Sequence, residues 1–165
     1  MSIKAIPEDF HTVTVYLGVH DGNAAIDFYK RAFNAREEFR LDRPDGRVGH
    51  AELYIGDTRI MLSEPCDEGA LSSPVLTPTA DCSHKATVGL HLYVENVDLT
   101  YELVTDEEDV VVVSGLKDQF YGDRSFTLCD PFGHLWFISS HKEDVSAEEI
   151  KARAQRLFQG HDREL

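Results

Sequence analysis

The stretch VGHAELYIGDTRIMLS, residues 48–63, alternates apolar and polar side chains on both sides of Gly56 and Asp57. This alternation is typical of half-buried strands, and a Gly-Asp pair between two such runs predicts a two-residue hairpin turn. A related stretch, RSFTLCDPFGHLWFIS, occupies residues 124–139. The sequence therefore predicts two β-hairpins, the second turning at 130–133.

The residues before the first hairpin predict a strand, a helix and another strand. Residues 12–19, TVTVYLGV, are β-branched and aromatic, as strands are. Asp21 or Asn23 is expected to cap the helix at its start and Asn34 at its end. A further strand is expected at 36–42. The apolar positions at helical spacing are Ala25, Ile26, Tyr29 and Phe33.

The same order recurs in the second half of the chain. Strands are predicted at 88–94 and 110–114, with a short acidic helix at 97–107 between them. After the second hairpin, the sequence Ser-Ala-Glu-Glu from Ser146 resembles a capping box and opens a C-terminal helix at 146–159. The two halves align with an offset of about 75 residues, which indicates an internal duplication.

The duplication predicts an α+β fold of two βαβββ modules that form a curved sheet around a cavity, with a C-terminal helix added. Such a junction between modules is a common place for a ligand cavity. The expected segments are a first module at 10–64, a linker at 65–86, a second module at 87–142, and a C-terminal helix and tail at 143–165.

Charge and composition exclude several classes of protein. The 165 residues include 16 Lys and Arg against 30 Asp and Glu, a net charge of −14. This balance argues against nucleic acid and anionic membranes as partners. No apolar stretch is long enough for a spanning helix or a signal peptide. The three cysteines (Cys66, Cys82 and Cys129) form no CxxC motif and are expected to be reduced thiols. The expected location is cytoplasmic.

The repeated module, the opening YLGVHDGNAAIDFYKRAF, the hairpin GHAELYIGDTRIMLSE and the closing QFYGDRSFTLCDPFGHLWFIS resemble the vicinal-oxygen-chelate superfamily. That group contains glyoxalase I, extradiol dioxygenases and the bleomycin- and fosfomycin-resistance proteins, and the chain is most similar to its PhnB-like branch. The resemblance covers about residues 10–142. It implies the fold, but not the reaction, because the superfamily spans isomerases, oxygenases, transferases and binding proteins.

Metal-using members of the superfamily take two ligands from each module, one in the first strand and one in the last. The matching positions here are Thr14 and Met61 in the first module, and Gly89 and Phe137 in the second. None is a usual metal ligand. No cofactor is therefore predicted, and metal-dependent chemistry at the usual site is not expected.

Strand alternation predicts which side chains share the inner face. Across the first hairpin Glu52 is expected opposite Met61, with His50 on the same face. Across the second hairpin Phe126 is expected opposite Phe137, which turns Arg124 inward too. The predicted ligand-binding residues are Tyr16, Met61, Tyr93, Tyr121, Arg124, Phe126 and Phe137, and the candidate catalytic residues are His50, Glu52 and His91.

Each of these residues could instead have a purely structural role. His50 and Glu52 could form a local pair on a solvated face, His91 could be a satisfied core histidine, and the tyrosines could only pack. Arg124 could pair with Asp123 or Glu52, or clamp an anionic ligand. The run 120–124, FYGDR, is hardest to interpret as scaffold, because a glycine there suits a backbone bend at the mouth of a cavity.

Two functions are consistent with these residues. The first is a protein that binds a small, planar or aromatic molecule, and Arg124 would favour an acidic group on it. The alternative is a lactoylglutathione-lyase-like or other lyase or isomerase, using His50, Glu52 and His91 with or without a divalent metal. A scaffold with a vestigial pocket is a third, weaker interpretation. The resemblance also implies a homodimer.

Overall fold

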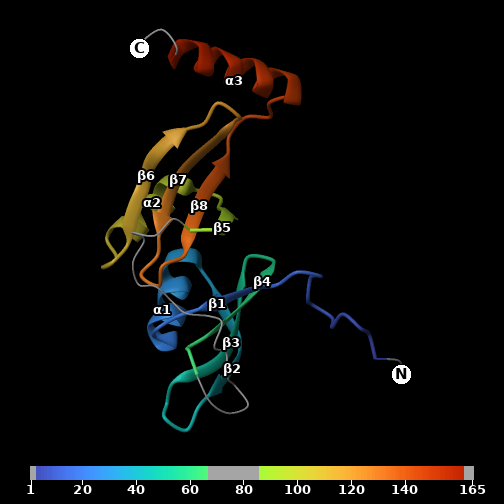
Figure 1. Ribbon diagram of the computed structural model, residues 1–165, viewed down its shortest axis with the longest axis vertical. Coiled ribbons are helices and arrows are strands. Elements are labelled where there is room, and N and C mark those ends of the chain that lie inside the picture. Colours follow the sequence, from blue (N-terminus) through green and yellow to red (C-terminus); the bar gives the residue numbers. More distant parts are fainter. Residues whose placement is uncertain (1–2, 67–85, 162–165) are drawn as a thin grey trace. The chain divides into compact units, whose positions relative to one another are not determined.

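The computed structural model describes residues 3–66 and 86–161. The chain divides into two compact units: unit 1 takes in the N-terminal part up to residue 84 together with 131–133, and unit 2 takes in 85–130 and the part from 134 onward. Each unit holds a mixed sheet (Figure 1), with one helix in unit 1 and two in unit 2 among the described residues. No helix within the described residues is both long and apolar enough to cross a bilayer.

Unit 1 is one βαβββ module. Its elements are β1 (Val15–Gly18), α1 (Gly22–Phe33), β2 (Arg36–Asp42), β3 (Val48–Ile55) and β4 (Thr58–Ser63). The sheet order is β1-β4-β3-β2, with β1 parallel to β4 and the other pairs antiparallel. This confirms the predicted order of elements in the first half of the chain.

Local sequence explains where these elements begin and end. The Asp21 side chain accepts a hydrogen bond from the Ala24 N–H at 3.0 Å and so caps α1. Asn34 ends the helix in the left-handed region, at φ 53°. Gly56, at φ 59°, makes the two-residue turn between β3 and β4, and the predicted pairing of Glu52 with Met61 is confirmed.

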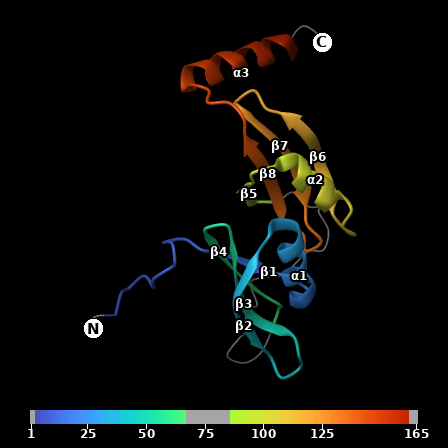
Figure 2. The ribbon, with the colours of Figure 1, turned by 180° about the vertical axis from the view of Figure 1, so that it is seen from behind.

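Unit 2 repeats the module and adds a helix. Its strands are β5 (Gly89–Tyr93), β6 (Val111–Asp118), β7 (Asp123–Cys129) and β8 (Leu135–His141), in the order β5-β8-β7-β6. Its helices are α2 (Val97–Thr105) and α3 (Ala147–His161). Figure 2 shows α2 lying against one face of this sheet. In each unit, the face of the sheet opposite the packed helix (α1 in unit 1, α2 in unit 2) is called the open face below.

The predicted register of the second hairpin is wrong by one residue. Phe126 pairs with Ile138, and Phe137 pairs with Thr127. The loop is five residues long rather than four, because the Asp130 N–H donates to the His134 carbonyl and β8 starts one residue later. A slip of one residue exchanges the two faces of a strand. Phe126 is consequently buried against Tyr101 of α2, not on the open face.

A bend at Gly122 joins the start of β7 to the segment after β8. Gly122 has φ 106°, and a Cβ there would come within 2.2 Å of the Glu143 carbonyl oxygen. Its own carbonyl accepts from the Lys142 and Glu143 N–H groups at 3.0 and 2.9 Å. Only glycine fits this conformation and this close approach. The bend expected from the run 120–124 is thus a clamp that holds residues 142–145 beside the sheet.

Two further predictions concern the linker and the state of the cysteines. Most of the predicted linker, residues 67–85, lies outside the described residues. Cys129 takes part in a disulfide bond, so the expectation of three reduced thiols is wrong. The widely spaced cysteines carried no pattern from which this could be predicted, because disulfide pairing depends on tertiary proximity.

Candidate functional site

The open face of the unit 1 sheet carries a chain of polar contacts. The Tyr16 hydroxyl and Nδ1 of His50 are hydrogen-bonded at 2.9 Å, and Nε2 of His50 lies 3.3 Å from the Glu52 carboxylate. Because a carboxylate only accepts, Nε2–H is the donor in the second contact, and a neutral ring then accepts the Tyr16 proton at Nδ1. Met61 neighbours both Tyr16 and Glu52 in the sheet. These four residues share one face, as predicted.

Arg59 extends this series of polar contacts and was not predicted as a site residue from the sequence. It forms an ion pair with Glu52, donates to the Tyr54 hydroxyl at 2.7 Å and lies 4.3 Å from the ring centroid of Phe10. Its side chain is only 10% exposed, and Nε has no hydrogen-bond partner among the described residues. Glu52 is therefore ion-paired with a neighbouring arginine, which the strand pattern alone did not indicate.

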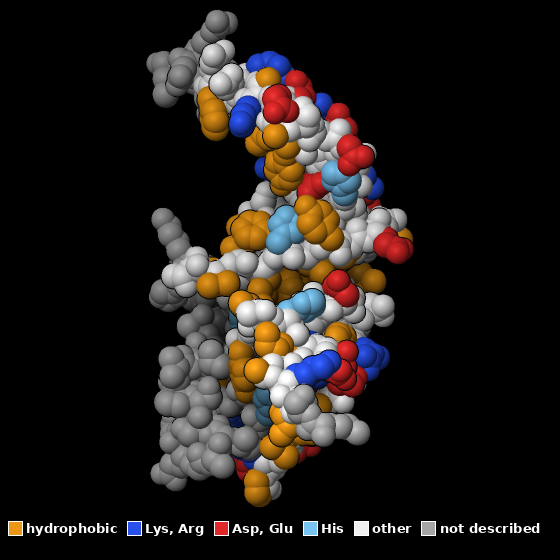
Figure 3. Space-filling model, turned by 90° about the vertical axis from the view of Figure 1, so that its right-hand side faces the viewer, with side chains coloured by type: hydrophobic (Ala, Val, Ile, Leu, Met, Phe, Trp, Pro, Cys, Tyr) orange, Lys and Arg blue, Asp and Glu red, His pale blue; other side chains and the backbone are white. Residues whose placement is uncertain are grey.

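The open face of the unit 2 sheet carries three stacked rings. The His91 ring lies 4.7 Å from that of Tyr93, at an interplanar angle of 28°, and 6.3 Å from that of Phe137. Tyr93 is 61% and Phe137 40% exposed, so both rings present large apolar surfaces to solvent. His91 also lies 3.0 Å from the Ser139 hydroxyl. Figure 3 shows hydrophobic side chains beside histidines in the upper part of the surface.

Gly89 and Phe137, the residues predicted to match the superfamily's metal-ligand positions in unit 2, lie close together. A Cβ added to Gly89 would lie 2.5 Å from Cε2 of Phe137, so the phenyl ring occupies the space where a side chain at residue 89 would begin. In neither unit do the described residues bring three His, Cys, Asp or Glu side chains together as a metal site. The Gly89–Phe137 pair therefore presents an apolar surface.

Four polar side chains of unit 2 form a second series of hydrogen bonds at the end of the open face. The Tyr93 hydroxyl donates to one oxygen of Asp123, and Nδ1 of His141 donates to the other, both at 2.8 Å. Nε2 of His141 donates to Asp144 at 2.9 Å. The bond to Asp123 raises the pKa of Tyr93, and the bonds to Asp123 and Asp144 raise the pKa of His141.

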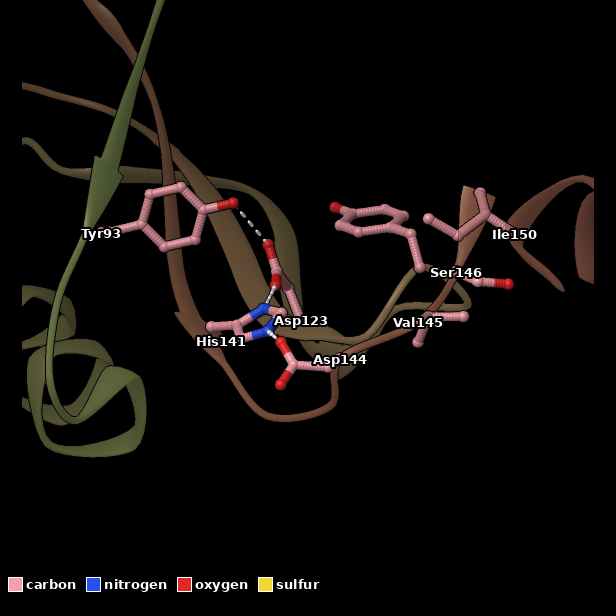
Figure 4. Close-up of a pocket in the computed structure, with 8 residues that line it drawn as sticks. Tyr93, Asp123, His141, Asp144, Val145, Ser146 and Ile150 are labelled. Carbon is pink, nitrogen blue, oxygen red and sulfur yellow. Dashed lines mark hydrogen bonds and ion pairs between the residues drawn. The ribbon is translucent and has the colours of Figure 1, made fainter. Parts of the chain in front are cut away.

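These four hydrogen-bonded side chains form one side of a cavity of about 450 Å³. Figure 4 shows Tyr93, Asp123 and His141 on one side and Val145, Ser146 and Ile150 on the other. The full lining is Tyr93, Tyr121, Asp123, His141, Asp144, Val145, Ser146 and Ile150. Two of the predicted ligand-binding residues, both tyrosines, border it.

Arg124 does not lie where it was predicted. The register slip places it on the helix-covered face, where it contacts Asp98 of α2 through Nε and Nη2 and Asp118 of β6 through Nη1, at 2.9–3.0 Å. Of the two protein partners considered for it, Asp123 instead accepts from Tyr93 and His141, whereas Glu52 lies in unit 1, so that pairing is not tested. The hydrogen bonds from Arg124 lower the pKa of Asp98. Arg124 therefore joins α2 to the sheet and gives no reason to expect an acidic ligand.

The catalytic trio stays a prediction. His50 and Glu52 lie together on unit 1 and His91 lies on unit 2, so the contact that the trio requires is not tested within either unit. Besides Arg59, the residues that sequence reasoning missed are Asp123, His141 and Asp144. The run 120–124 was the one signal for Asp123, whereas His141 and Asp144 follow the last predicted strand and carried no motif.

Comparisons with known proteins agree with this fold. A profile of the Glyoxalase/Bleomycin resistance protein/Dioxygenase superfamily matches residues 10–138. The chain belongs to this superfamily.

Relatives and solved structures extend the comparison. An uncharacterized protein of Mycobacterium bovis is 36% identical over 83% of this chain and 88% of its own length. A bleomycin resistance protein of Staphylococcus aureus is 33% identical over 53% of this chain and 68% of its own. TioX from Micromonospora sp. ML1 superposes with a TM-score of 0.59 at 26% identity, covering 80% and 99% of the two chains. The fosfomycin resistance protein FosX from Listeria monocytogenes, at 17% identity and a TM-score of 0.57, covers 86% and 98% and shares the fold.

Proposed function

We propose that this protein binds a small organic molecule with an aromatic or planar part, without a metal at the superfamily positions. The observation that carries the proposal is the packing of Phe137 over Gly89. Where a metal-using relative presents ligand atoms from two strands, this chain presents a phenyl ring. An apolar ring at that place favours stacking of an aromatic ligand over chelation of its oxygen atoms.

The neighbouring rings support the same function. His91, Tyr93 and Phe137 form a stacked aromatic surface that is substantially exposed, although such side chains normally favour burial. Aromatic surface of this kind gives a ligand large contact area at a low cost in side-chain entropy. The bleomycin resistance proteins among the relatives indicate the kind of molecule with which to test it.

The test is a calorimetric titration of the purified, metal-analysed protein with bleomycin. We expect saturable binding in protein that holds far less than one Zn, Ni, Fe or Mn per chain, and weaker binding in Phe137→Ala. The control is Phe158→Ala, an exposed phenylalanine on α3. Absence of saturable binding, or a stoichiometric metal that is lost in His91→Ala, contradicts the proposal.

A lyase or isomerase is the second candidate, and the contacts of His50 favour it. A histidine that is held by a tyrosine on one nitrogen and a carboxylate on the other is oriented for proton transfer. The test is formation of lactoylglutathione from methylglyoxal and glutathione, with His50→Gln as the variant. Turnover that this variant abolishes would support an enzyme. A rate equal to that without protein would exclude this reaction.

Homodimer formation is proposed from the superfamily resemblance. The expected observation is a sedimenting species of twice the 18.6 kDa chain mass at micromolar concentration. A species of single-chain mass would contradict it.

A further inference from the structure

The cavity beside the start of α3 is not accounted for by the superfamily's shared region. The superfamily match ends at residue 138, and five of the eight lining residues come after it: His141, Asp144, Val145, Ser146 and Ile150. The cavity is therefore made largely by the C-terminal extension of this chain. Its volume of about 450 Å³ lies within the range of small-molecule sites.

The geometry points to an organic cation as the occupant: we propose that this cavity is a subsite for a cationic group that carries an aromatic or aliphatic substituent, with Asp123 as its counterion. The inference rests on the proposed function, since Tyr93 belongs both to the stacked rings and to this cavity. It adds the charge of the ligand and a second part of the site.

Asp123 supplies the negative charge. The residue is only 4% exposed, yet it sits at the wall of a cavity, and each of its carboxylate oxygens accepts one hydrogen bond from the protein. A carboxylate oxygen has two lone-pair sites, so one remains on each oxygen for a donor from a ligand. A charged group held at this depth interacts more strongly with an ion than a surface carboxylate does.

The remaining charges around the cavity do not favour an anion. Both ring nitrogens of His141 already donate to Asp123 and Asp144, so its positive charge offers no free N–H to a ligand. With this histidine charged, the lining still has a net charge of about −1. The start of α3 is a weakly positive helix end, but Glu148 and Glu149 in its first turn offset it.

The other walls suit the body of such a cation. Tyr93 and Tyr121 place aromatic rings at the cavity, and the faces of such rings attract organic cations. Val145 and Ile150 form an apolar wall on the side of α3. The clamp at Gly122 holds Tyr121 and the segment 142–145 together, so these walls have defined positions before a ligand arrives.

The test is an NMR titration of the full chain with benzyltrimethylammonium, in parallel with neutral benzyl alcohol and anionic benzenesulfonate. We expect saturable shifts of the His141 ring signals with the cation, at least tenfold weaker binding of the alcohol, and no saturable shift with the sulfonate. Equal binding of cation and alcohol, or no saturable shift with the cation, overturns the proposal.

Two variants locate the binding. Asp123→Asn is expected to weaken cation binding at least tenfold. Asp118→Asn is the matched control, because Asp118 carries the same charge but is exposed and pairs with Arg124 away from the cavity. Equal weakening in both would show a general effect of this acidic protein and would overturn the subsite. Should Asp123→Asn fail to fold, Tyr121→Leu takes its place, with a threefold or greater loss expected and an unchanged affinity counting against the proposal.

The two proposals fail separately. Bleomycin binding without benzyltrimethylammonium binding would remove the cation subsite and leave the proposed function. Saturable cation binding that depends on Asp123, in a protein that does not bind bleomycin, would keep the cavity as a cation site and reject the aromatic ligand of the proposed function.

Discussion

The phenyl ring of Phe137 stands over Gly89, so close that a Cβ at residue 89 would lie 2.5 Å from Cε2 of the ring. In the register of the parallel strands β5 and β8, Gly89 pairs with Leu135 and Phe137 pairs with His91, so the ring reaches across from the position two residues along the strand. The absence of a side chain at 89 and the position of the ring at 137 are therefore one feature. A side chain at residue 89 requires the ring to move away.

This relationship predicts a non-additive pair of substitutions. Gly89→Ala is expected to lower the free energy of unfolding by about 1 kcal/mol, because the methyl group displaces the ring. In a Phe137→Ala background the same change is expected to be neutral or slightly stabilising. Urea unfolding of the four proteins measures the coupling. Gly115→Ala on β6 is the control, since its added Cβ meets nothing within 4 Å; equal costs in both backgrounds would contradict the prediction.

Asp130 is expected to be the most sensitive carboxylate in unit 2. It is 1% exposed and accepts from the His134 N–H at 2.8 Å and the Trp136 indole N–H at 2.9 Å. Asp130→Ala leaves these donors without that acceptor and should cost about 3 kcal/mol in urea unfolding, whereas Asp130→Asn should cost about 1 kcal/mol. A loss below about 0.5 kcal/mol for the alanine variant would show that other groups satisfy the donors.

The same carboxylate predicts acid sensitivity. Burial opposes its charge, but the hydrogen bond and charge of His134, with the Trp136 N–H, outweigh burial and lower the pKa of Asp130. A lowered native pKa gives stability that is present above the unfolded-state value of about 3.9 and is lost as the pH falls through the native value. Below about pH 4 the difference in stability between wild type and Asp130→Asn should shrink. A constant difference would contradict this assignment.

Glu64 is expected to play a comparable part in unit 1. The residue is 4% exposed, and one oxygen accepts from the Gly22 N–H at 3.1 Å and the Val48 N–H at 2.8 Å. Glu64→Ala should cost about 2–3 kcal/mol, because it leaves two buried backbone donors without this acceptor. Thermal unfolding compares it with Glu38→Ala, which changes a more exposed side chain paired with Arg36. Similar melting temperatures for the two variants would refute the prediction.

His141 predicts a loss of stability on the alkaline side. Its pKa is raised by hydrogen bonds to Asp123 and then Asp144, so the folded state holds the proton more tightly than the unfolded chain. The resulting stability is present below the unfolded value of about 6.5 and is lost as the pH rises through the raised native value. An NMR titration should find the pKa of His141 above 6.5 and lower in Asp144→Asn. A pKa that is the same in both proteins would contradict the assignment to Asp144.

The sequence predicted the elements of the fold well because their signals are local. Alternation, the Asp21 and Asn34 caps and the two-residue turn at Gly56 act within a few residues, and the first hairpin formed in the predicted register. The shared face of Tyr16, His50, Glu52 and Met61 followed from that register, as did the repetition of the βαβββ order.

The second hairpin shows a strand register that local sequence signals did not predict. Its five-residue loop depends on Asp130, whose side chain caps the His134 N–H and also reaches Trp136. The extra loop residue moved Phe126 and Arg124 to the helix-covered face, and Arg124 then found its partners in Asp98 and Asp118. Such partners are distant in sequence and cannot be read from spacing.

The sequence by itself therefore determined the duplicated module and the membership of a superfamily. Only the tertiary structure decided which charges meet: it removed Arg124 from the open face and brought Asp123, His141 and Asp144 together beside α3. The physical reason is range. Hydrophobic periodicity and helix capping act between residues that are close in the sequence. Cavities and ion pairs depend on how segments that are distant in the sequence pack together.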